Sequence, residues 1–275
     1  MKDKWEVIFL DKIAFVDDLL REVTFTFPPK RILSLCPSIT ETLYHLQLEE
    51  QIVGRTRYCI HPKDQRNLAT IVGGTKQIQR EIIDQLQPDL IIAEKEENPK
   101  QMILELAQEY PVFVLDVEKY EDALRMIHHL GHITDRIDLA EKIVQDIEGK
   151  FQQLNSTQDI AVAYLIWRKP YMTVGKETYI RSILDKCGFI NVFDNKRERY
   201  PAVNVEDIKS ARPQFIFLSS EPFPFDENHL EELRTVYPQA VPILVDGEMF
   251  SWYGARMLKA VDYLNDLIGR IRTLQ

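Results

Sequence analysis

Short apolar runs alternate with amphipathic, helix-like stretches along this chain, and the alternation occurs twice. Six runs of this kind occur at residues 31–35, 88–93, 112–115, 160–166, 213–218 and 242–245. Apolar runs of this length between helical stretches are typical of strands in parallel sheets. The pattern therefore predicts an α/β protein with two lobes, each with a small, mostly parallel sheet and flanking helices.

The stretch 120–154 separates the two series of runs and has a helical pattern without proline, which predicts one long rigid helix that joins the lobes. We therefore expect an amino-terminal lobe at 1–119, a connecting helix at 120–154 and a carboxy-terminal lobe at 155–275. A cleft between the lobes is the expected ligand site, because small ligands bind in clefts between domains.

Two local signals add detail to the amino-terminal lobe. The β-prone runs 6–10 and 22–27 predict a small sheet at the start of the chain. Ser38 and Glu41 have the spacing of a capping box, in which each side chain bonds the other residue's backbone N–H. This spacing predicts a helix over about 40–48.

Composition narrows the classes of partner. The 275 residues include 34 Lys and Arg against 43 Asp and Glu, a net charge of −9, which argues against nucleic acid and anionic membranes as partners. No apolar stretch approaches the roughly 20 residues that span a bilayer, and the opening residues lack the apolar region of a secretory leader. We expect a monomer that is cytoplasmic as written, or periplasmic or surface-anchored if a leader is missing.

The sequence offers little reactive chemistry. Cys36, Cys59 and Cys187 are widely spaced and are interpreted as free thiols. His128 and His132 have the i, i+4 spacing of metal ligands, but without a third ligand a solvated helix face is the favoured interpretation. Motifs such as G-x-S-x-G and H-E-x-x-H are absent from the sequence. We therefore predict no catalytic residue, no metal, no covalent cofactor and no enzymatic activity.

Aromatic and charged residues follow the apolar runs, where the carboxyl ends of strands in open α/β sheets bind ligands. The aromatic residues suit a flat, partly apolar ligand, and they are Trp167, Tyr171, Phe223, Phe225, Phe250, Trp252 and Tyr253. The charged residues could bind carboxylate, amide or phosphate groups, and they are Arg57, Lys76, Lys95, Glu96, Glu97, Arg168, Glu221, Asp246 and Glu248. The alternatives are aromatic packing onto the core, solvated loop charges, and an acid pair such as Asp246 and Glu248 in an active site.

Several segments in order resemble the helical-backbone substrate-binding proteins of ABC importers, which bind vitamin B12, ferric siderophores or haem. The matching segments are 22–41, 53–62, 87–93, 173–179, 187–193 and 212–217. The resemblance extends from about residue 15 to the end and is closest to the vitamin B12-binding branch. It implies two α/β lobes bridged by one long helix.

The resemblance also implies roles for single residues. Tyr58 and Tyr200 match aromatic positions that sandwich the ligand, whereas Thr75 and Glu94 stand where that family has tryptophans. In importers each lobe presents a glutamate to arginines of the permease, and the matching residues are Glu81 and Glu206. Each stands seven residues before a proline. The alternative is that both are ordinary glutamates in the first turn of a helix.

The ligand-binding residues predicted from all these signals are Arg57, Tyr58, Lys76, Glu97, Trp167, Arg168, Tyr171, Tyr200, Phe223, Phe225, Glu248, Phe250, Trp252 and Tyr253. The predicted function is that of a solute-binding protein for a corrinoid or a related metal chelate, such as a ferric siderophore or haem. It would serve an ABC importer through Glu81 and Glu206. The alternative is a leaderless cytoplasmic enzyme, or a protein that handles or senses chelates, with the same fold.

Overall fold

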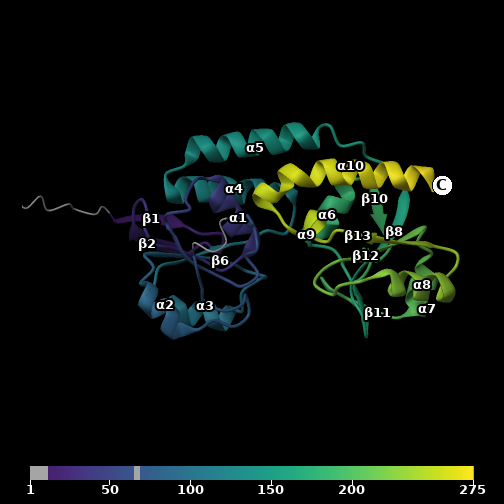
Figure 1. Cartoon of the computed structure of the whole chain (residues 1–275), viewed down its shortest axis with the longest axis horizontal. Helices are drawn as coiled ribbons and strands as arrows, with labels where there is room; N and C mark the ends of the chain where they lie inside the picture. The colour runs from purple at the N-terminus through teal and green to yellow at the C-terminus, as the bar shows by residue number, and fades with distance from the viewer. Residues whose placement is uncertain (1–11, 65–68, 275) are drawn as a thin grey trace, which may run out of the picture. The chain divides into compact units, whose positions relative to one another are not determined.

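The computed structural model describes residues 12–64 and 69–274, and the chain divides into two compact lobes. The first lobe comprises Met1–Asp116 and Arg125–Ile143, and the second comprises Val117–Leu124 and Val144–Gln275. Each lobe is an α/β unit with its own sheet (Figure 1). The predicted fold class is therefore confirmed. The predicted β run 6–10 lies outside the described residues.

The sheet of the first lobe has five strands in the order β5–β4–β3–β6–β7, and all neighbours are parallel. Its strands are β3 (Ile32–Ser34), β4 (Ile52–Arg55), β5 (Thr70–Ile71), β6 (Leu90–Glu94) and β7 (Val112–Leu115). Its short helices are α1 (Pro37–His45), α2 (Arg80–Leu86) and α3 (Lys100–Leu106). A separate antiparallel hairpin of β1 (Lys12–Val16) and β2 (Glu22–Thr26) precedes the sheet. Strand β2 matches the predicted run 22–27, whereas the sequence pattern did not indicate β1.

The sheet of the second lobe has the order β11–β9–β8–β12–β13, with β10 also paired to β8. The pairs β8–β12, β12–β13 and β8–β10 are parallel, whereas β9 pairs antiparallel with β8 and β11. Its strands are β8 (Ile160–Trp167), β9 (Tyr171–Thr173), β10 (Phe189–Asn191), β11 (Ala202–Val203), β12 (Phe215–Ser219) and β13 (Val241–Val245). Its helical segments are α6 (Tyr179–Lys186), α7 (Val205–Ala211), α8 (Glu227–Val236), α9 (Glu248–Ser251), η1 (Gly254–Arg256) and α10 (Met257–Thr273).

Helices cover the sheets through apolar residues that the strands present alternately to their two faces. In the first lobe, Ile83 of α2 and Ile103 of α3 pack in one cluster with sheet residues such as Ile91. In the second lobe, α7 and α8 pack on one face, and Phe250 and Tyr263 contact rings on the other. All six predicted apolar runs form strands that supply side chains to these cores, and two of them, β7 and β13, lie at sheet edges.

The prediction of one continuous helix over 120–154 is wrong, because two helices occupy this stretch. They are α4 (Tyr120–Thr134) and α5 (Ile137–Phe151). Asp135 between them has a left-handed conformation with φ of 59°, and the N–H of Arg136 donates to the carbonyl of Gly131 at 2.8 Å. This is the six-to-one bond of a Schellman C-cap, which ends a helix. Aspartate tolerates the left-handed region better than most residues, so neither glycine nor proline marks this break.

The predicted capping box is also wrong. Helix α1 begins earlier, with Pro37 in its first turn and Cys36 as its N-cap, and no side chain caps it. Ser38 and Glu41 therefore lie inside the helix, and both side chains are buried. Proline fixes φ near the helical value and tolerates the first turn, which explains the earlier start.

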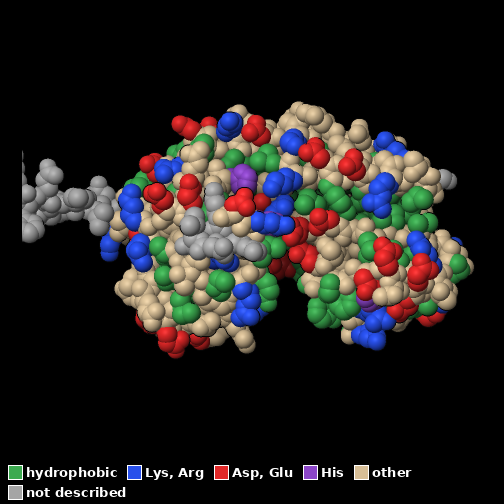
Figure 2. Space-filling model, in the orientation of Figure 1, with side chains coloured by type: hydrophobic (Ala, Val, Ile, Leu, Met, Phe, Trp, Pro, Cys, Tyr) green, Lys and Arg blue, Asp and Glu red, His purple; other side chains and the backbone are tan. Residues whose placement is uncertain are grey.

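Among the described residues, no helix is both long enough and apolar enough to cross a membrane. On the face that Figure 2 shows, acidic and basic side chains lie interspersed with apolar ones on both lobes. Lysines and arginines on this face therefore offset part of the negative net charge locally.

Candidate functional site

Four predicted ligand residues of the first lobe come from loops at the carboxyl ends of its strands. Arg57 and Tyr58 follow β4, and both are exposed, with 54% of Tyr58 accessible. A Cβ atom at Gly74 would lie 3.2 Å from the Tyr58 ring and 3.7 Å from Nε of Arg57. Lys76 donates from Nζ to the carbonyl of Glu96 at 2.8 Å. The structure thus gathers these loops, as the strand-end rule predicts.

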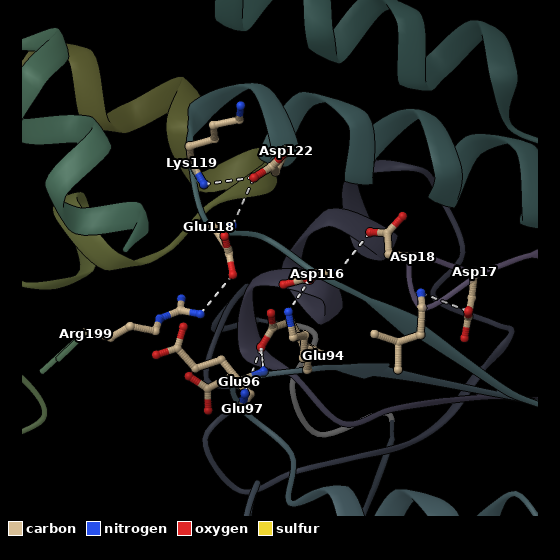
Figure 3. A network of polar contacts seen from close by, with 12 residues as sticks. Asp17, Asp18, Glu94, Glu96, Glu97, Asp116, Glu118, Lys119, Asp122 and Arg199 are labelled. Atoms are coloured by element: carbon tan, nitrogen blue, oxygen red, sulfur yellow. Dashed lines mark hydrogen bonds and ion pairs between the residues drawn. The ribbon is translucent and has the colours of Figure 1, made fainter. Parts of the chain in front are cut away.

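A buried carboxylate supports this group (Figure 3). Glu94 closes β6 with 1% of its surface exposed, and its Oε2 accepts from the backbone N–H groups of Glu96 at 2.8 Å and Glu97 at 2.7 Å. Burial raises the pKa of Glu94 to about 7, although these two hydrogen bonds lower it. Burial also raises the pKa of half-buried Glu97, and the ammonium of Lys76 opposes this shift. Two acids and one lysine therefore share a small volume.

In the second lobe, Trp167 and Phe223 form an aromatic group at the ends of β8 and β12. Trp167 is 41% exposed and meets the half-buried Phe223 edge to face, with ring centroids 5.7 Å apart. Phe223 in turn contacts Phe225 at 4.8 Å and His229 at 5.3 Å. Edge-to-face pairs of this kind stabilise a fixed ring arrangement. The exposed indole is therefore held by its neighbours in one orientation.

Arg168 and Tyr171 both contact Glu232, a residue of helix α8. The guanidinium of Arg168 pairs with Glu232 at 2.6 Å, and the hydroxyl of Tyr171 donates to the other carboxylate oxygen of Glu232 at 3.4 Å. Sequence reasoning missed both Glu232 and His229. Their i, i+3 spacing in an amphipathic helix was the available signal, but nothing in the sequence linked α8 to the strand-end loops.

The prediction that Phe250 contacts ligand directly is wrong, because its side chain does not reach the surface. It is 0% exposed and contacts the rings of Tyr164 and Phe217 in the core. Phe225, Trp252 and Tyr253 are also buried, with at most 7% of each exposed. The physical reason is that large aromatic rings near strand ends gain most by packing under their loops.

Trp252 belongs to a polar network that fixes the segment after β13. Its indole Nε1 donates to Oε1 of Glu221 at 3.0 Å, and the Arg256 guanidinium lies 5.3 Å from its ring centroid. Arg256 also pairs with half-buried Glu248 at 3.4 Å. Burial raises the pKa of Glu221, which the Ser251 hydroxyl lowers by hydrogen bonding. Glu248 is thus held in place by a buried arginine.

Tyr200 is half-buried and lies next to an ion pair. Arg199 donates to Oε1 of Glu118 at 3.0 Å (Figure 3), and both residues belong to the second lobe. The backbone carbonyl of Arg199 accepts from the N–H of Gly175 at 2.7 Å. A Cβ atom at Gly175 would lie 2.3 Å from the carbonyl oxygen of Glu198, so glycine permits this close backbone approach.

Each lobe also has a groove, and the one in the second lobe includes Glu118, the ion-pair partner of Arg199. One, of about 390 Å³ in the first lobe, is lined by Arg31, Glu49, Glu50, Ile52, Val53 and Leu86. The other, of about 600 Å³ in the second lobe, is lined by Glu118, Lys119, Glu121, Asp122, Glu177, Thr178, Arg181, Ser182, Asp185 and Lys186. Neither is lined by a predicted ligand residue.

Glu81 and Glu206 occupy the same local structure in their respective lobes. Each is an exposed residue in the first turn of a seven-residue helix, α2 or α7. Each helix ends at a left-handed residue, Gln87 with φ of 44° or Arg212 with φ of 50°, and a proline and a central strand follow. The Glu206 side chain is 78% exposed and pairs with Lys209 at 2.9 Å.

Metal-ligating residues do not gather in the part of the chain that the structure describes. There, no group of three or more His, Cys, Asp or Glu side chains is arranged to hold a metal ion. Cys36, Cys59 and Cys187 are free thiols and are buried. Burial raises the pKa of Cys59 and of Cys187, so both remain protonated at neutral pH.

Solved structures with similar folds come from several binding proteins. The vitamin B12-binding protein BtuF of Vibrio cholerae has a TM-score of 0.77 at 24% identity, covering 90% of this chain and 99% of that chain. The haem-binding protein RhuT from Roseiflexus sp. RS-1 has a TM-score of 0.74 at 19% identity, with 87% and 96% covered. The Fe³⁺-hydroxamate transport protein from Saccharomonospora viridis has a TM-score of 0.71 at 18% identity, with 94% and 99% covered. These likenesses show a shared fold.

Sequence comparison gives the family. The vitamin B12-binding protein of Vibrio cholerae serotype O1 is 29% identical over 198 residues, which cover 70% of this chain and 71% of that protein. The model of the periplasmic binding protein family matches residues 32–235, well over half of the chain. These relatives are solute-binding proteins and not enzymes. The chain therefore belongs to the periplasmic binding protein family and is a solute-binding protein.

Proposed function

We propose that this solute-binding protein takes up a corrinoid or a related metal chelate, such as a ferric siderophore or haem. The observation that carries the proposal is a pair of exposed aromatic side chains at strand ends, Tyr58 in the first lobe and Trp167 in the second. Aromatic faces of this kind stack on flat conjugated ligands. Relatives named for vitamin B12, haem and Fe³⁺-hydroxamate support this ligand class.

Charged and polar neighbours of the two rings would bind the ligand periphery. Arg57 and Lys76 suit carboxylate, amide or phosphate groups, since both are donors without acceptor capacity. The other proposed contacts are Glu97, Arg168, Tyr171, Tyr200, Phe223 and Glu248, while Phe225, Trp252 and Tyr253 support their loops. The protein would hold the ligand by stacking and hydrogen bonds and carry out no reaction on it.

A ligand panel tests the proposal. Cyanocobalamin, haemin and a ferric hydroxamate are titrated into the full chain while tryptophan fluorescence is followed, since Trp167 is 41% exposed. We expect a dissociation constant near micromolar or tighter for one of them, about −8 kcal/mol. Loss of one stacking ring, by Tyr58→Ala or Trp167→Ala, should weaken binding by roughly three- to tenfold.

Leu104→Ala is the matched control, because Leu104 is an apolar side chain of α3 that is 46% exposed. It should leave the affinity unchanged. If folded protein binds no member of the panel, the chelate proposal fails. If a member binds and both ring variants bind it equally well, the proposed site is wrong.

We further propose that the protein delivers its ligand to an ABC permease through Glu81 and Glu206. It would then act outside the cytoplasmic membrane. The matching local structure of the two glutamates supports this, because a permease with two related halves needs one contact from each lobe. Exposed charge pairs mainly set encounter rate and orientation. The double variant Glu81→Ala, Glu206→Ala should therefore lose permease binding relative to the wild type, most strongly at low salt, where exposed charge pairs are least screened, and should keep ligand affinity.

The permease and ATPase encoded beside this chain, reconstituted in lipid nanodiscs, serve as the binding partner in this test. Glu227→Ala is the control, because Glu227 is another exposed glutamate in the first turn of a helix of the second lobe. Unchanged binding by the double variant would refute the docking role. If no permease is encoded nearby, a protein that handles or senses chelates becomes the better proposal.

A further inference from the structure

A buried polar bracket lies beneath the strand-end loops of the first lobe. It consists of Glu94 and Asn98, which are 1% and 2% exposed. Asn98 accepts from the N–H of Glu94 at 2.9 Å and donates from Nδ2 to the carbonyls of Leu35 at 3.2 Å and Thr75 at 3.0 Å. The Glu94–Asn98 bracket therefore joins three segments: the end of β3, the loop between β5 and α2, and the loop between β6 and α3.

The proposed ligand residues Lys76 and Glu97 are attached to this bracket. Lys76 is the neighbour of Thr75 and donates to the carbonyl of Glu96 at 2.8 Å. The N–H groups of Glu96 and Glu97 both donate to the Glu94 carboxylate. A shift of that carboxylate would therefore move the backbone that carries Glu97 and the acceptor that fixes Lys76.

Charged groups of the first lobe surround the carboxylate from several elements. Glu96 and Glu97 of its own loop act on it directly, and Lys76 from the loop after β5 acts on Glu97. The Lys95–Asp116 pair, 2.6 Å apart, lies at the ends of β6 and β7. Burial and the neighbouring charges of Glu97 and Glu96 raise the pKa of Glu94 to about 7, against the two backbone hydrogen bonds. The carboxylate that accepts from the N–H groups of Glu96 and Glu97 therefore loses its charge close to neutral pH.

We propose that Glu94 is a positioning residue whose ionised carboxylate holds the N–H groups of Glu96 and Glu97 while Glu94 itself stays buried, so that acidification loosens the loop 94–98 and weakens ligand binding. Hydrogen bonds to a charged acceptor are about twice as strong as those to a neutral one. The neutral carboxyl carries its proton on one oxygen, and its other oxygen accepts from the two N–H groups more weakly than the carboxylate does. The ligand part of this proposal rests on the proposed function, whereas the loop part does not.

The first experiment needs no ligand. Amide hydrogen exchange of Glu96 and Glu97 is measured in the full chain between pH 5.5 and 8 and corrected for the intrinsic exchange rate. We expect the protection of both amides to fall by roughly tenfold on acidification. Glu94→Gln should abolish this pH step, and Glu105→Gln should keep it, because Glu105 is an exposed residue of the following helix α3.

A flat wild-type profile would overturn the proposal, and so would a step that survives in Glu94→Gln. The wild-type profile is decisive even if Glu94→Gln fails to fold.

The second experiment uses cyanocobalamin, or whichever of haemin and the ferric hydroxamate binds. We expect its dissociation constant to rise roughly three- to tenfold between pH 8 and pH 5.5 for the wild type and Glu105→Gln. The constant should stay flat for Glu94→Gln. If no probe binds, the proposed function fails while amide exchange still decides the loop part. If a probe binds equally at both pH values although the amides show the step, control of ligand binding by Glu94 is refuted.

Discussion

Asp17 shows how much one buried side chain organises the start of the first lobe. It is 2% exposed, and its carboxylate accepts from the N–H groups of Leu19 at 3.0 Å and Arg21 at 2.9 Å. It also accepts from Nε of Arg21 at 2.9 Å and from the N–H of Val114 in β7 at 3.3 Å. One carboxylate therefore shapes the β1–β2 turn and ties it to the central sheet.

Asp17→Ala should lower the free energy of unfolding by about 2–4 kcal/mol, because it removes the acceptor of several hydrogen bonds, including the one from the buried N–H of Val114. Urea denaturation measures the change. Asp262→Ala is the control, since that side chain is 75% exposed and pairs only at the surface with Lys150, where a salt bridge contributes about 0–1 kcal/mol. Similar losses in both variants would contradict the bridging role of Asp17.

Because the pKa of Glu94 is raised, the free energy of unfolding should fall as the pH rises. Its pKa is raised to about 7 by burial, so between its ordinary value and pH 7 the folded state binds a proton that the unfolded state has lost. Its contribution is therefore greatest at low pH and declines as the pH rises through neutrality, by about 3 kcal/mol in total. This burial term affects the whole fold, whereas the two hydrogen bonds of the carboxylate order only the local loop.

Urea denaturation at pH 5 and pH 8 tests this linkage. The wild type and Glu105→Gln should lose about 3 kcal/mol more between these pH values than Glu94→Gln does. Glutamine removes the titration and keeps an acceptor oxygen. Parallel pH profiles for the wild type and Glu94→Gln would mean that Glu94 does not titrate in this range.

At the scale of elements, Gly131 allows α4 and α5 to pack closely as a helical hairpin. A Cβ atom at Gly131 would lie 2.5 Å from the Cβ of Ala140, whereas one at Gly149 of α5 would meet nothing within 4 Å. Gly131→Ala should therefore cost about 1–3 kcal/mol through overpacking. Gly149→Ala should stabilise by about 0.5–1 kcal/mol through helix propensity. Thermal unfolding should show a lower melting temperature for Gly131→Ala and a higher one for Gly149→Ala. Equal shifts in the two variants would contradict the close packing at Gly131.

The same hairpin marks where sequence reasoning failed. Apolar periodicity predicted helix throughout 120–154 because both halves are amphipathic, and the turn at Asp135 interrupts the pattern for only two residues. The six buried strand runs were predictable, since a strand buried on both faces is apolar along its length. The short strands β5 and β11, with two residues each, are too short to leave a pattern.

At the scale of the whole molecule, the strand-end rule located the candidate groups but could not sort buried from exposed aromatic rings. Phe223 and Phe250 both follow strand runs, yet only Phe223 is half-exposed, because packing by distant residues such as Tyr263 buries Phe250. Glu232 was missed for the same reason, since it stands 64 positions from Arg168, its partner. Local patterns carry no information on such distant contacts.

The two lobes are interleaved along the chain, and this determines which fragments can fold. The first lobe takes residues 125–143 from beyond the boundary at 119 that the sequence suggested, and the second takes 117–124. Residues 125–143 give the first lobe a contact of His129 Nδ1 with Asp18 Oδ1 at 3.1 Å and a ring contact of His129 with Phe113. They also include buried Met126, Ile127 and Leu130.

A fragment of residues 1–119 should therefore fail to form a cooperative fold, whereas a fragment of residues 1–151 should form one. Removal of a segment with several buried apolar side chains costs roughly 1.5–3 kcal/mol for each of them, which exceeds the stability of a small domain. Near-ultraviolet circular dichroism and urea denaturation of both fragments, with the full chain as reference, measure the outcome. A sharp unfolding transition in fragment 1–119 with the midpoint of fragment 1–151 would show that the first lobe is complete without α4 and α5.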